Sequence, residues 1–279
     1  MIRYIPALLL ACSTSALAQT APETPLPPAD EVLNANVTTI GGGIGMTPDY
    51  EGSNDYRIIP AAAIRTRIGN VGITTRGLYV YADLINTGGK VDFDLGPIAG
   101  LRMNRSGKIK DDVVDLLPER NKAIEVGGFA GVSFHQLTNP YDTLSIRLDA
   151  VHDVGKAHKS TVVTPTIDFA TPLSRSIYVG ASLSADFVSN RFADYYFSIS
   201  PADTLASGLP TFDAGGGMKS WKVGALANYS LSGNLLKGWS IFALANHSQL
   251  LGDFKRSPIV RDRGSASQWM GALGLAYTF

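Results

Sequence analysis

The chain of 279 residues has a single cysteine, Cys12, which lies in an apolar N-terminal stretch typical of an export signal. Once that stretch is removed, the remaining chain has no thiol. A disulfide framework and a metal site built on thiolate ligands are therefore excluded.

Charged residues are scarce as well, at 17% of the chain against roughly 25% in a typical soluble domain. The formal net charge is zero, which offers no electrostatic basis for binding nucleic acid. Hydrophobic residues make up 45% of the chain, enough to exclude wholesale disorder. This balance is typical of a protein with a large surface that does not face water.

Long apolar runs are also missing. Beyond the N-terminal stretch, no run reaches the roughly 18 residues that a membrane-spanning helix needs. The sequence lacks a P-loop, a dinucleotide fingerprint and a zinc motif, and neither a helix nor a Lys-Ser/Thr pair follows the glycine row at 41–45. We therefore predict no cofactor, and interpret these glycines as sites of strand bending or close backbone approach.

Residues 1–18 predict a signal peptide. Arg3 supplies the positive charge, residues 5–11 form the apolar stretch, and a small-x-small motif ends at Ala18. Cleavage is therefore expected between Ala18 and Gln19, and the protein is expected to be exported.

A second interpretation of the N-terminus is lipidation, because residues 9–12 resemble a lipoprotein box in which Cys12 would be acylated. Cys12 falls very early and a good cleavage site follows it, so cleavage after Ala18 is favoured. Residues 19–34 are rich in proline and predict an extended periplasmic tail.

The strongest signal in the chain is alternation of apolar and polar residues. In residues 177–187, IYVGASLSADF, the apolar side chains share one face and the small or polar ones the other. Many such segments are about eleven residues long, which suits a tilted strand crossing a membrane, whereas strands of soluble sandwiches average about five or six. The segments are 35–46, 56–68, 71–81, 91–96, 124–137, 144–149, 159–171, 177–187, 219–231, 238–249 and 267–279.

Several polar faces carry a charge in the middle of the strand. A basic side chain facing lipid at mid-depth would cost about 2–4 kcal/mol, so these charges are expected to face a narrow polar lumen and to pair there. Because lipid offers no partner for an open sheet edge, the sheet must close into a barrel. The expected lumen charges are Arg65, Asp94, Arg102, Arg147, Asp149, Asp168 and Asp186.

These segments number eleven, but single-chain bacterial barrels normally have an even number of strands. The twelfth strand comes either from a bend at Arg76-Gly77 within 71–84 or from 195–200. The bend is favoured because it places the short connections on the periplasmic side and the long ones outside. We therefore predict an all-β, transmembrane antiparallel β-barrel of about 12 strands over residues 35–279. The long connections are 47–55, 104–123, 191–218 and 250–266.

The end of the chain, QWMGALGLAYTF, resembles the C-terminal assembly signal of outer-membrane proteins. The side chains that share its apolar face are Leu273, Leu275, Tyr277 and Phe279, together with Trp269. This predicts recognition by the barrel assembly machinery and residence in the outer membrane, among outer-membrane lipid and lipopolysaccharide.

Ser133 and His135 are a candidate catalytic pair, since a histidine base can activate a serine nucleophile. Side chains two apart in a strand lie about 6–7 Å from each other, too far for a direct hydrogen bond. We therefore predict that the protein is not an enzyme. His152, Asp153 and His158 could hold a metal, but a solvated loop tip is the favoured interpretation.

Two short helices are expected in the long connections. Residues 108–122 carry acids beside apolar residues at helical spacing, which predicts a short helix that packs the loop. Residues 201–207 follow a capping serine, Ser200, with Pro201 first and Asp203 third, and Gly208 ends the turn. This second helix is expected to lie on or plug the outer mouth.

The stretch PDYEGSNDYRIIP, residues 48–60, does not have the residue order of a calcium loop. It predicts an outward hairpin that turns at 52–54, with Tyr50 and Tyr56 at the membrane interface and Arg57 facing the lumen. Pro60 within a paired strand indicates a bulge.

Three parts of the chain resemble the MipA/OmpV family of outer-membrane proteins: residues 48–60, residues 195–219 and residues 250–260 with the strand that follows. The residues that carry the resemblance are Pro48, Tyr50, Gly52, Ser53, Pro60, Tyr196, Phe197, Ser207, Gly208, Ser257 and Pro258.

This resemblance implies a structural or scaffolding role, in which the barrel links a lytic transglycosylase and a penicillin-binding protein of murein metabolism to the outer membrane. Other members of the family are porin-like or adhesive. A channel for small solutes is therefore the alternative, with a lipid-directed hydrolase behind it.

Overall fold

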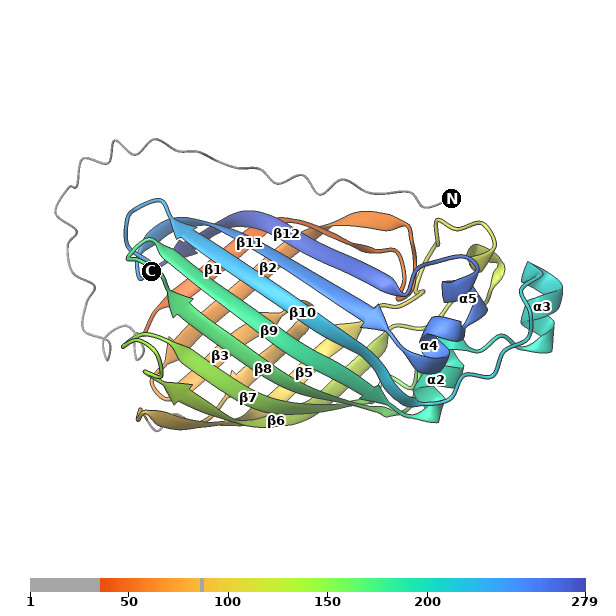
Figure 1. Cartoon of the computed structure of the whole chain (residues 1–279), viewed down its shortest axis with the longest axis horizontal. Coiled ribbons are helices and arrows are strands. Elements are labelled where there is room, and N and C mark those ends of the chain that lie inside the picture. The colour runs from red at the N-terminus through yellow and green to blue at the C-terminus, as the bar shows by residue number, and fades with distance from the viewer. Residues whose placement is uncertain (1–35, 86–87) are drawn as a thin grey trace.

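The computed structural model describes residues 36–85 and 88–279. Twelve antiparallel strands follow one another around a closed barrel, and β1 pairs with β12 to complete it (Figure 1). The predicted fold class and strand number are confirmed. The predicted signal peptide and tail, with Ala18 and Gln19, lie outside the described residues.

The strands are β1 (Thr38–Pro48), β2 (Tyr56–Ile68), β3 (Val71–Arg76), β4 (Tyr79–Asp83), β5 (Val91–Arg102), β6 (Ala123–His135), β7 (Thr143–Asp153), β8 (Thr161–Pro172), β9 (Ile177–Val188), β10 (Gly217–Ser230), β11 (Gly238–Leu250) and β12 (Ser267–Thr278). The helices are η1 (Val114–Leu116), α2 (Asn190–Phe197), α3 (Pro201–Ser207), α4 (Gly252–Arg256) and α5 (Pro258–Arg261).

The twelfth strand arises where the favoured prediction put it. The segment after β2 turns back at Gly77, which has a left-handed φ of 61°, and so forms the two short strands β3 and β4. Residues 195–200 do not form a strand but contribute to α2 and to the turn after it.

Alternation along each strand sorts the side chains between lipid and lumen. On β5, Phe93 and Leu95 are exposed on the outer face, whereas Asp92 is buried and Asp94 half-buried on the inner face. A strand passing through a barrel wall needs this pattern, because one face meets hydrocarbon and the other meets polar groups.

Aromatic side chains border the outer face at both ends. Near the short turns, the ring of Tyr277 lies 5.1 Å from that of Trp239 and 5.0 Å from that of Phe279. Near the long connections, His247 packs on Trp269 at 4.8 Å. Such aromatic girdles mark the two interfaces of a membrane barrel.

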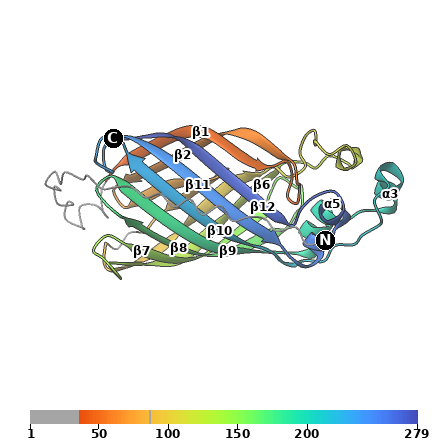
Figure 2. The same ribbon diagram turned by 45° about the horizontal axis from the view of Figure 1, so that its top comes forward.

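The helices of the described residues all lie at one end of the barrel, with the long connections (Figure 2). We take this end as the outer mouth, since outer-membrane barrels have short periplasmic turns and long outer loops. In the described residues, no helix is long and apolar enough to cross a membrane.

The predicted helix at 201–207 is confirmed as α3, including its capping box between Ser200 and Asp203 and a left-handed Gly208. Its predicted position is wrong. It stands away from the barrel (Figure 1), and Leu205 is 90% exposed. The sequence PADTLAS has too little apolar surface to bury, so the helix stays in solvent.

Two other local predictions have opposite outcomes. Residues 108–122 contain the 3₁₀ helix η1, with Val114 and Leu117 buried against the loop, as expected. Pro60 does not sit in a bulge, because β1 and β2 pair in unbroken register from Thr38 and Thr66 to Pro48 and Tyr56.

Candidate functional site at the outer mouth

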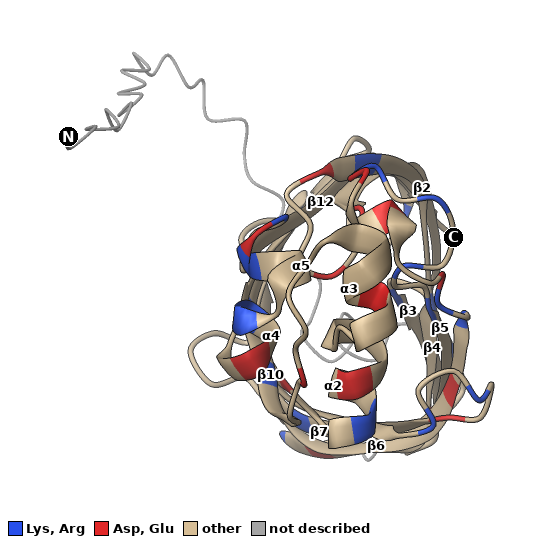
Figure 3. Cartoon of the chain, turned by 90° about the vertical axis from the view of Figure 1, so that its right-hand side faces the viewer, with Lys and Arg blue, Asp and Glu red and all other residues tan. Residues whose placement is uncertain are grey.

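Three segments that are far apart in the sequence meet in the outer mouth: the loop 49–55, helix α2, and the pair α4–α5. Figure 3 shows the three helices at the mouth. We call these segments together the mouth plug. Tyr50 donates a hydrogen bond from its hydroxyl to the carbonyl of Ile259 at 2.9 Å. Ser257 donates to the carbonyl of Phe197 at 2.6 Å. The three regions of family resemblance therefore pack against one another.

Helix α2 forms the centre of the mouth plug. Phe192, Ala193, Tyr196 and Phe197 are all 0% exposed. Their spacing of i, i+1, i+4 and i+5 places them on one face of a helix. The ring of Phe192 lies 4.9 Å from that of Tyr196. A strand of the wall needs apolar residues at every second position, and this segment does not have them. It forms a helix instead, and the apolar face of that helix packs in the mouth.

The loop 49–55 folds into the barrel and not outward into solvent, which corrects the prediction of an outward hairpin. Tyr50 is buried, so its expected place at the membrane interface is wrong. The turn spans Tyr50 to Ser53, whose amide donates to the Tyr50 carbonyl at 2.9 Å. Gly52 donates to the side chain of Gln268 at 3.0 Å, which fixes the loop against β12.

Glu51, at the tip of this loop, points into the lumen. Lys219 Nζ lies 2.8 Å from one of its carboxylate oxygens, and Arg102 lies 3.1 Å from the other. Burial opposes ionisation of Glu51, but Lys219 and Arg102 outweigh it and lower the pKa of Glu51 below its usual value. Glu51 is therefore a carboxylate at neutral pH.

Lys219 reaches the lumen through a β-bulge. Met218 pairs with Phe187 and Ser220 pairs with Asp186, so Lys219 is the extra residue in β10. A bulge re-aims a side chain that alternation would send to the other face. Lys219 consequently lies buried, 3.1 Å from Asp186 as well as close to Glu51.

We call the acidic and basic side chains below α2 the mouth charge cluster. It contains three acids and three bases: Glu51, Glu125, Asp186, Arg102, Lys219 and Lys222. Arg102 donates to Glu125 at 2.9 Å, and Lys222 lies 2.7 Å from Asp186. Charges removed from water are tolerated only when such partners satisfy them.

The mouth plug and the charge cluster are in direct contact. The ring of Phe192 lies 5.3 Å from the Arg102 guanidinium and 5.2 Å from the Lys219 ammonium. A cation over an aromatic face gains roughly 0.5–2 kcal/mol, more where water is excluded. The helix is thus held from below by the charges of the barrel wall.

Glu125 is fully buried and also binds groups outside the cluster. It accepts a hydrogen bond from the Tyr79 hydroxyl, and His158 Nε2 lies 2.8 Å from its Oε1. His158 packs edge-on against Phe192 at 5.0 Å. His158 was expected in a solvated loop tip, and that prediction is wrong, because the loop folds inward to reach Glu125.

Arg105 ties the mouth plug to the long loop after β5. It donates to the carbonyl of Tyr196 at 3.2 Å and to that of Pro118 at 3.5 Å. Burial, and then the nearby Arg120, lower the pKa of Arg105 to about 10. Arg105 therefore remains charged at neutral pH.

A second group of lumen charges lies deeper in the barrel. Arg147 donates to Asp149 at 2.6 Å and lies 3.6 Å from Asp168, which also pairs with Arg76 at 3.0 Å. The Arg147 guanidinium stacks over Tyr81 at 5.2 Å. These contacts join strands β3, β4, β7 and β8 across the lumen.

The structure thus divides the seven expected lumen charges among different environments. Arg102 and Asp186 belong to the mouth charge cluster, and Arg147, Asp149 and Asp168 to the deeper group. Asp94 accepts a hydrogen bond from Ser133 at 2.6 Å. Arg65 is exposed and takes part in none of the ion pairs found among the described residues.

The remaining residues singled out in the sequence lie at the rim or on the wall. Ser207 and Gly208 end α3, away from the barrel, and Pro48 ends β1. Ser53 and Pro258 are buried in the mouth plug. The side chains of the expected assembly signal share the outer face at the end of β12: Leu273, Leu275, Tyr277 and Phe279.

The candidate catalytic and metal-binding residues have separate partners. Ser133 hydrogen-bonds to Asp94 and Ser145, whereas His135 bonds to Thr143 at 2.9 Å. His152 bonds to Thr161 on the outer side of the wall. Across the described ranges, 36–85 and 88–279, no group of three or more His, Cys, Asp or Glu side chains could hold a metal ion.

Sequence reasoning missed Glu51, Glu125, Lys219, Lys222, Tyr79 and His158 as members of this site. The position of Glu125 could have been predicted, since alternation along β6 places it on the same lumen face as Ser133. The position of Lys219 could not, because its side chain points into the lumen only through the bulge.

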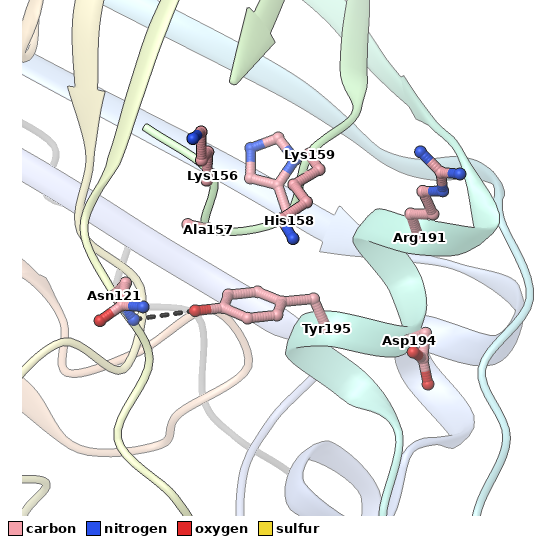
Figure 4. A pocket seen from close by; sticks show the side chains of 8 residues that line it. All are labelled: Asn121, Lys156, Ala157, His158, Lys159, Arg191, Asp194 and Tyr195. Atoms are coloured by element: carbon pink, nitrogen blue, oxygen red, sulfur yellow. Dashed lines mark hydrogen bonds between the residues drawn. The ribbon is translucent and has the colours of Figure 1, made fainter. Parts of the chain in front are cut away.

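An open depression of about 430 Å³ borders α2 on its outer side (Figure 4). Lys156, Lys159 and Arg191 line it together with one acid, Asp194, and Asn121 donates from its backbone amide to the Tyr195 hydroxyl at 2.9 Å. All three cations are exposed at the surface.

A closed antiparallel barrel with an apolar outer face, aromatic girdles and a charged lumen defines an outer-membrane β-barrel protein. The model of one family, described as MltA-interacting protein MipA, matches residues 40–279, and the chain belongs to this family. The family resemblance drawn from the sequence is therefore confirmed.

Solved barrels align over most of their length at low identity. The NanC porin is 9% identical, with a TM-score of 0.49, over 86% of this chain and 98% of its own. An outer-membrane channel from Pseudomonas putida F1 is 10% identical, with a TM-score of 0.44, over 94% and 100%. The translocator domain of NalP from Neisseria meningitidis is 12% identical, with a TM-score of 0.40, over 90% and 92%. A search of curated proteins finds no match.

Proposed function

We propose that this protein is a structural, scaffolding barrel of the outer membrane whose outer mouth is closed by α2. The observation that carries this proposal is the packing of four fully buried α2 side chains directly above the mouth charge cluster. A barrel that served mainly as an open pore would gain nothing from a buried aromatic helix in its mouth.

The partner is a periplasmic enzyme of murein metabolism. The family description names an interaction with MltA, a lytic transglycosylase, and we extend this to a penicillin-binding protein by resemblance. The periplasmic connections described are short, for example residues 69–70 between β2 and β3. The proline-rich stretch at 19–34 therefore offers the longer segment for a soluble partner to bind.

Cross-linking in intact envelopes tests the partnership. The full chain and a variant lacking residues 20–34 are each purified after cross-linking, and bound proteins are identified by mass spectrometry. We expect the murein enzymes with the full chain and their loss with the truncated one. A variant in which 20–34 is replaced by Gly-Ser repeats of equal length separates sequence from length. Equal recovery from all three chains would contradict the assignment of the tail.

The proposal also includes export with cleavage between Ala18 and Gln19, supported by the small-x-small motif that ends there. N-terminal sequencing of the protein purified from outer membranes should begin at Gln19. A lipid-modified chain beginning at Cys12 would overturn this.

A porin-like channel is the second candidate, in which α2 acts as a gate. It is favoured by the space below the mouth plug, where the inward side chains of Leu226 and Met270 are 39% and 41% exposed. Conductance in planar bilayers separates the candidates. The scaffold predicts almost no current for the purified protein, and steady current at neutral pH would favour the channel.

The proposal contains no enzymatic reaction, because Ser133 and His135 are each engaged with other side chains. Hydrolysis of lipid by the purified protein, lost on Ser133→Ala, would be needed to reopen a catalytic role.

A further inference from the structure

The barrel wall is incomplete on one side. Strands β3 and β4 have only 6 and 5 residues, against 13 in β2 and 12 in β5. Six residues rise about 20 Å along a strand, and a tilt of about 40° leaves about 15 Å of height, whereas the apolar band of such barrels is about 25 Å tall. The β3–β4 hairpin is therefore shorter than the band: its turn reaches Gly100 and Leu101 near the outer end of β5, but it pairs only with Arg65–Ile68 of β2.

The register shows where the wall is missing. β3 starts at the periplasmic end, where Val71 pairs with Ile68, and its pairing with β2 extends only to Arg65. β2 continues outward to Tyr56, and in the described part of the chain this outer half has β1 as its single strand neighbour. The opening thus lies in the outer half of the membrane, between β2 and the hairpin.

The opening is a window with a closed upper border. The loop after β5 crosses to the outer end of β2, where Lys110 Nζ donates to the Tyr56 carbonyl at 2.5 Å and its amide to Asp49 at 2.8 Å. On the other side, the Leu101 amide donates to the carbonyl of Leu78 at the hairpin turn. We call this opening the wall window.

Pro60 lies at the open edge of the window. The backbone amide and carbonyl of Ile64 point toward the hairpin, since both bond to the Thr75 hydroxyl. Alternate residues of a strand point the same way, so Ala62, Pro60 and Ile58 direct their backbone groups into the window. Proline supplies no amide there, and it is found at strand edges because it prevents pairing with another strand. A docked strand or second copy is therefore a poor occupant.

Next to the window, the lumen face of β2 carries apolar and small side chains from Ile59 to Ala63, and the exposed Arg65 follows them. Ile59 faces inward beside Gly45, with 3.5 Å between its Cγ1 and the point where a Cβ on Gly45 would lie. Ala61 and Ala63 follow on the same face of β2. Ile59 is 37% exposed although it faces the lumen, so the space in front of it is not filled. The opposite wall carries the deeper group of charges around Arg147.

The border of the window is apolar below and cationic above. Ile58 is 77% exposed on the lipid face, and Leu78 and Met103 are also exposed. At the outer end lie the exposed Lys108, Lys110, whose Nζ bonds to the Tyr56 carbonyl, and Arg57, which pairs with Asp49. Apolar side chains therefore border the part of the window at membrane depth, and basic residues border its outer end. This arrangement suits an amphiphile that has an acyl chain and an anionic headgroup.

We propose that the wall window admits an acyl chain of a phosphorylated outer-leaflet glycolipid, whose headgroup phosphate binds near Lys108 and Lys110 while the chain lies against Ile59 in the lumen. The open backbone groups of β2 remain hydrated from the lumen, as non-helical backbone at membrane depth must be. The site does not depend on the proposed scaffolding role, and its tests involve neither murein enzymes nor current.

Cysteine labelling tests whether the window is open to the membrane. The two test variants are Ile59→Cys and Leu226→Cys, each in a Cys12→Ser background. Both side chains face the lumen and have similar exposed fractions, 37% and 39%. They differ in that β10 is paired with a strand on both sides at Leu226. A phospholipid with a maleimide on its acyl chain should label Ile59→Cys much faster than Leu226→Cys, after normalisation to a small soluble maleimide. Ile58→Cys, on the lipid face, is the positive control. Equal rates at Ile59→Cys and Leu226→Cys would overturn the proposal.

A photo-cross-linking amino acid at Ile59 identifies the occupant in native membranes. The expected product is an adduct carrying both phosphate and acyl groups, reduced when Lys108 and Lys110 are both replaced by Gln. A cross-linked dimer, an adduct with another protein, or the absence of any adduct would each reject the lipid occupant.

Discussion

Lys219 on β10 and Glu51 in the first outer loop lie 2.8 Å apart, although 168 positions separate them in the sequence. The contact joins the barrel wall to the mouth plug. It depends on two local events, the inward fold of the loop 49–55 and the bulge that turns Lys219 into the lumen. The position of the mouth plug therefore depends on the wall as well as on the packing of its own segments.

Replacing Phe192 by Ala should loosen α2 without unfolding the barrel. Phe→Ala changes in packed sites cost about 3–5 kcal/mol, and this one also removes the ring above Arg102 and Lys219. We expect faster amide exchange in 190–199 and increased conductance in planar bilayers.

Leu205→Ala on α3 is the control for this change, since Leu205 is 90% exposed and touches little. It should leave both measurements unchanged. The shift in gel mobility between boiled and unboiled samples should persist in both variants, because neither changes a strand. Unaltered exchange in Phe192→Ala would show that α2 is not held by this ring.

The barrel was predictable from the sequence because its causes are local. Each strand must present one face to lipid, so a segment such as 177–187 reveals its two faces on its own, and the lack of partners in lipid requires closure. The bend at Gly77 was predictable for a similar reason, since an even strand number required it.

The mouth plug was predictable only in part. The helix at 201–207 has a strong capping signal, which made it the expected plug, but capping reports helix formation and not burial. The true plug, α2, has its apolar residues at helical spacing with an N-cap, Ser189, whose side chain makes no capping bond. The contact between Glu125 and His158 depends on long-range register, which alternation does not reveal. The inward direction of Lys219 depends on a bulge, which alternation does not reveal either.

Acid should open the mouth. Burial opposes ionisation of Glu51, but Lys219 and Arg102 outweigh it and lower the pKa of Glu51. Asp111, in the loop after β5, also has a lowered pKa, because Arg263 lies 2.8 Å from its carboxylate and outweighs the effect of burial. A carboxylate whose pKa is lowered in the folded state stabilises that state. The full stabilisation is present above the ordinary pKa of the group, 4.5 for Glu. It is lost as the pH falls through the pKa of the group in the folded state.

We therefore expect amide exchange in α2 and conductance to be constant from neutral pH down to about 4.5 and to rise below it. Glu51→Gln removes one titrating group and should make the acid response smaller. A mouth that loosens as the pH is raised from neutral would contradict the assignment.

Gly52→Ala should disturb the first loop through a steric clash of the new Cβ atom, in addition to backbone strain. Gly52 has a φ of 103°, and an added Cβ would approach Val260 of α5. Gly107 has a φ of 127° with nothing within 4 Å of its Cβ position, so Gly107→Ala is a control with a similar backbone conformation. We expect proteolysis of the outer loops to increase in Gly52→Ala and to change much less in Gly107→Ala. Equal effects would assign the whole cost to the left-handed conformation.

A double-mutant cycle measures the link between loop and wall directly. Glu51→Gln leaves Arg102 and Lys219 with one partner fewer, and Lys219→Met leaves Glu51 with Arg102 alone. Because the two side chains share a contact, their effects on the free energy of α2 opening, from amide exchange, should be non-additive by about 0.5–3 kcal/mol. Pairing Glu51→Gln with Asp168→Asn, whose partners Arg76 and Arg147 lie in the deeper group, should give additive effects. Additivity in the first cycle would mean that the loop is held by packing, and that the bulge serves Asp186 alone.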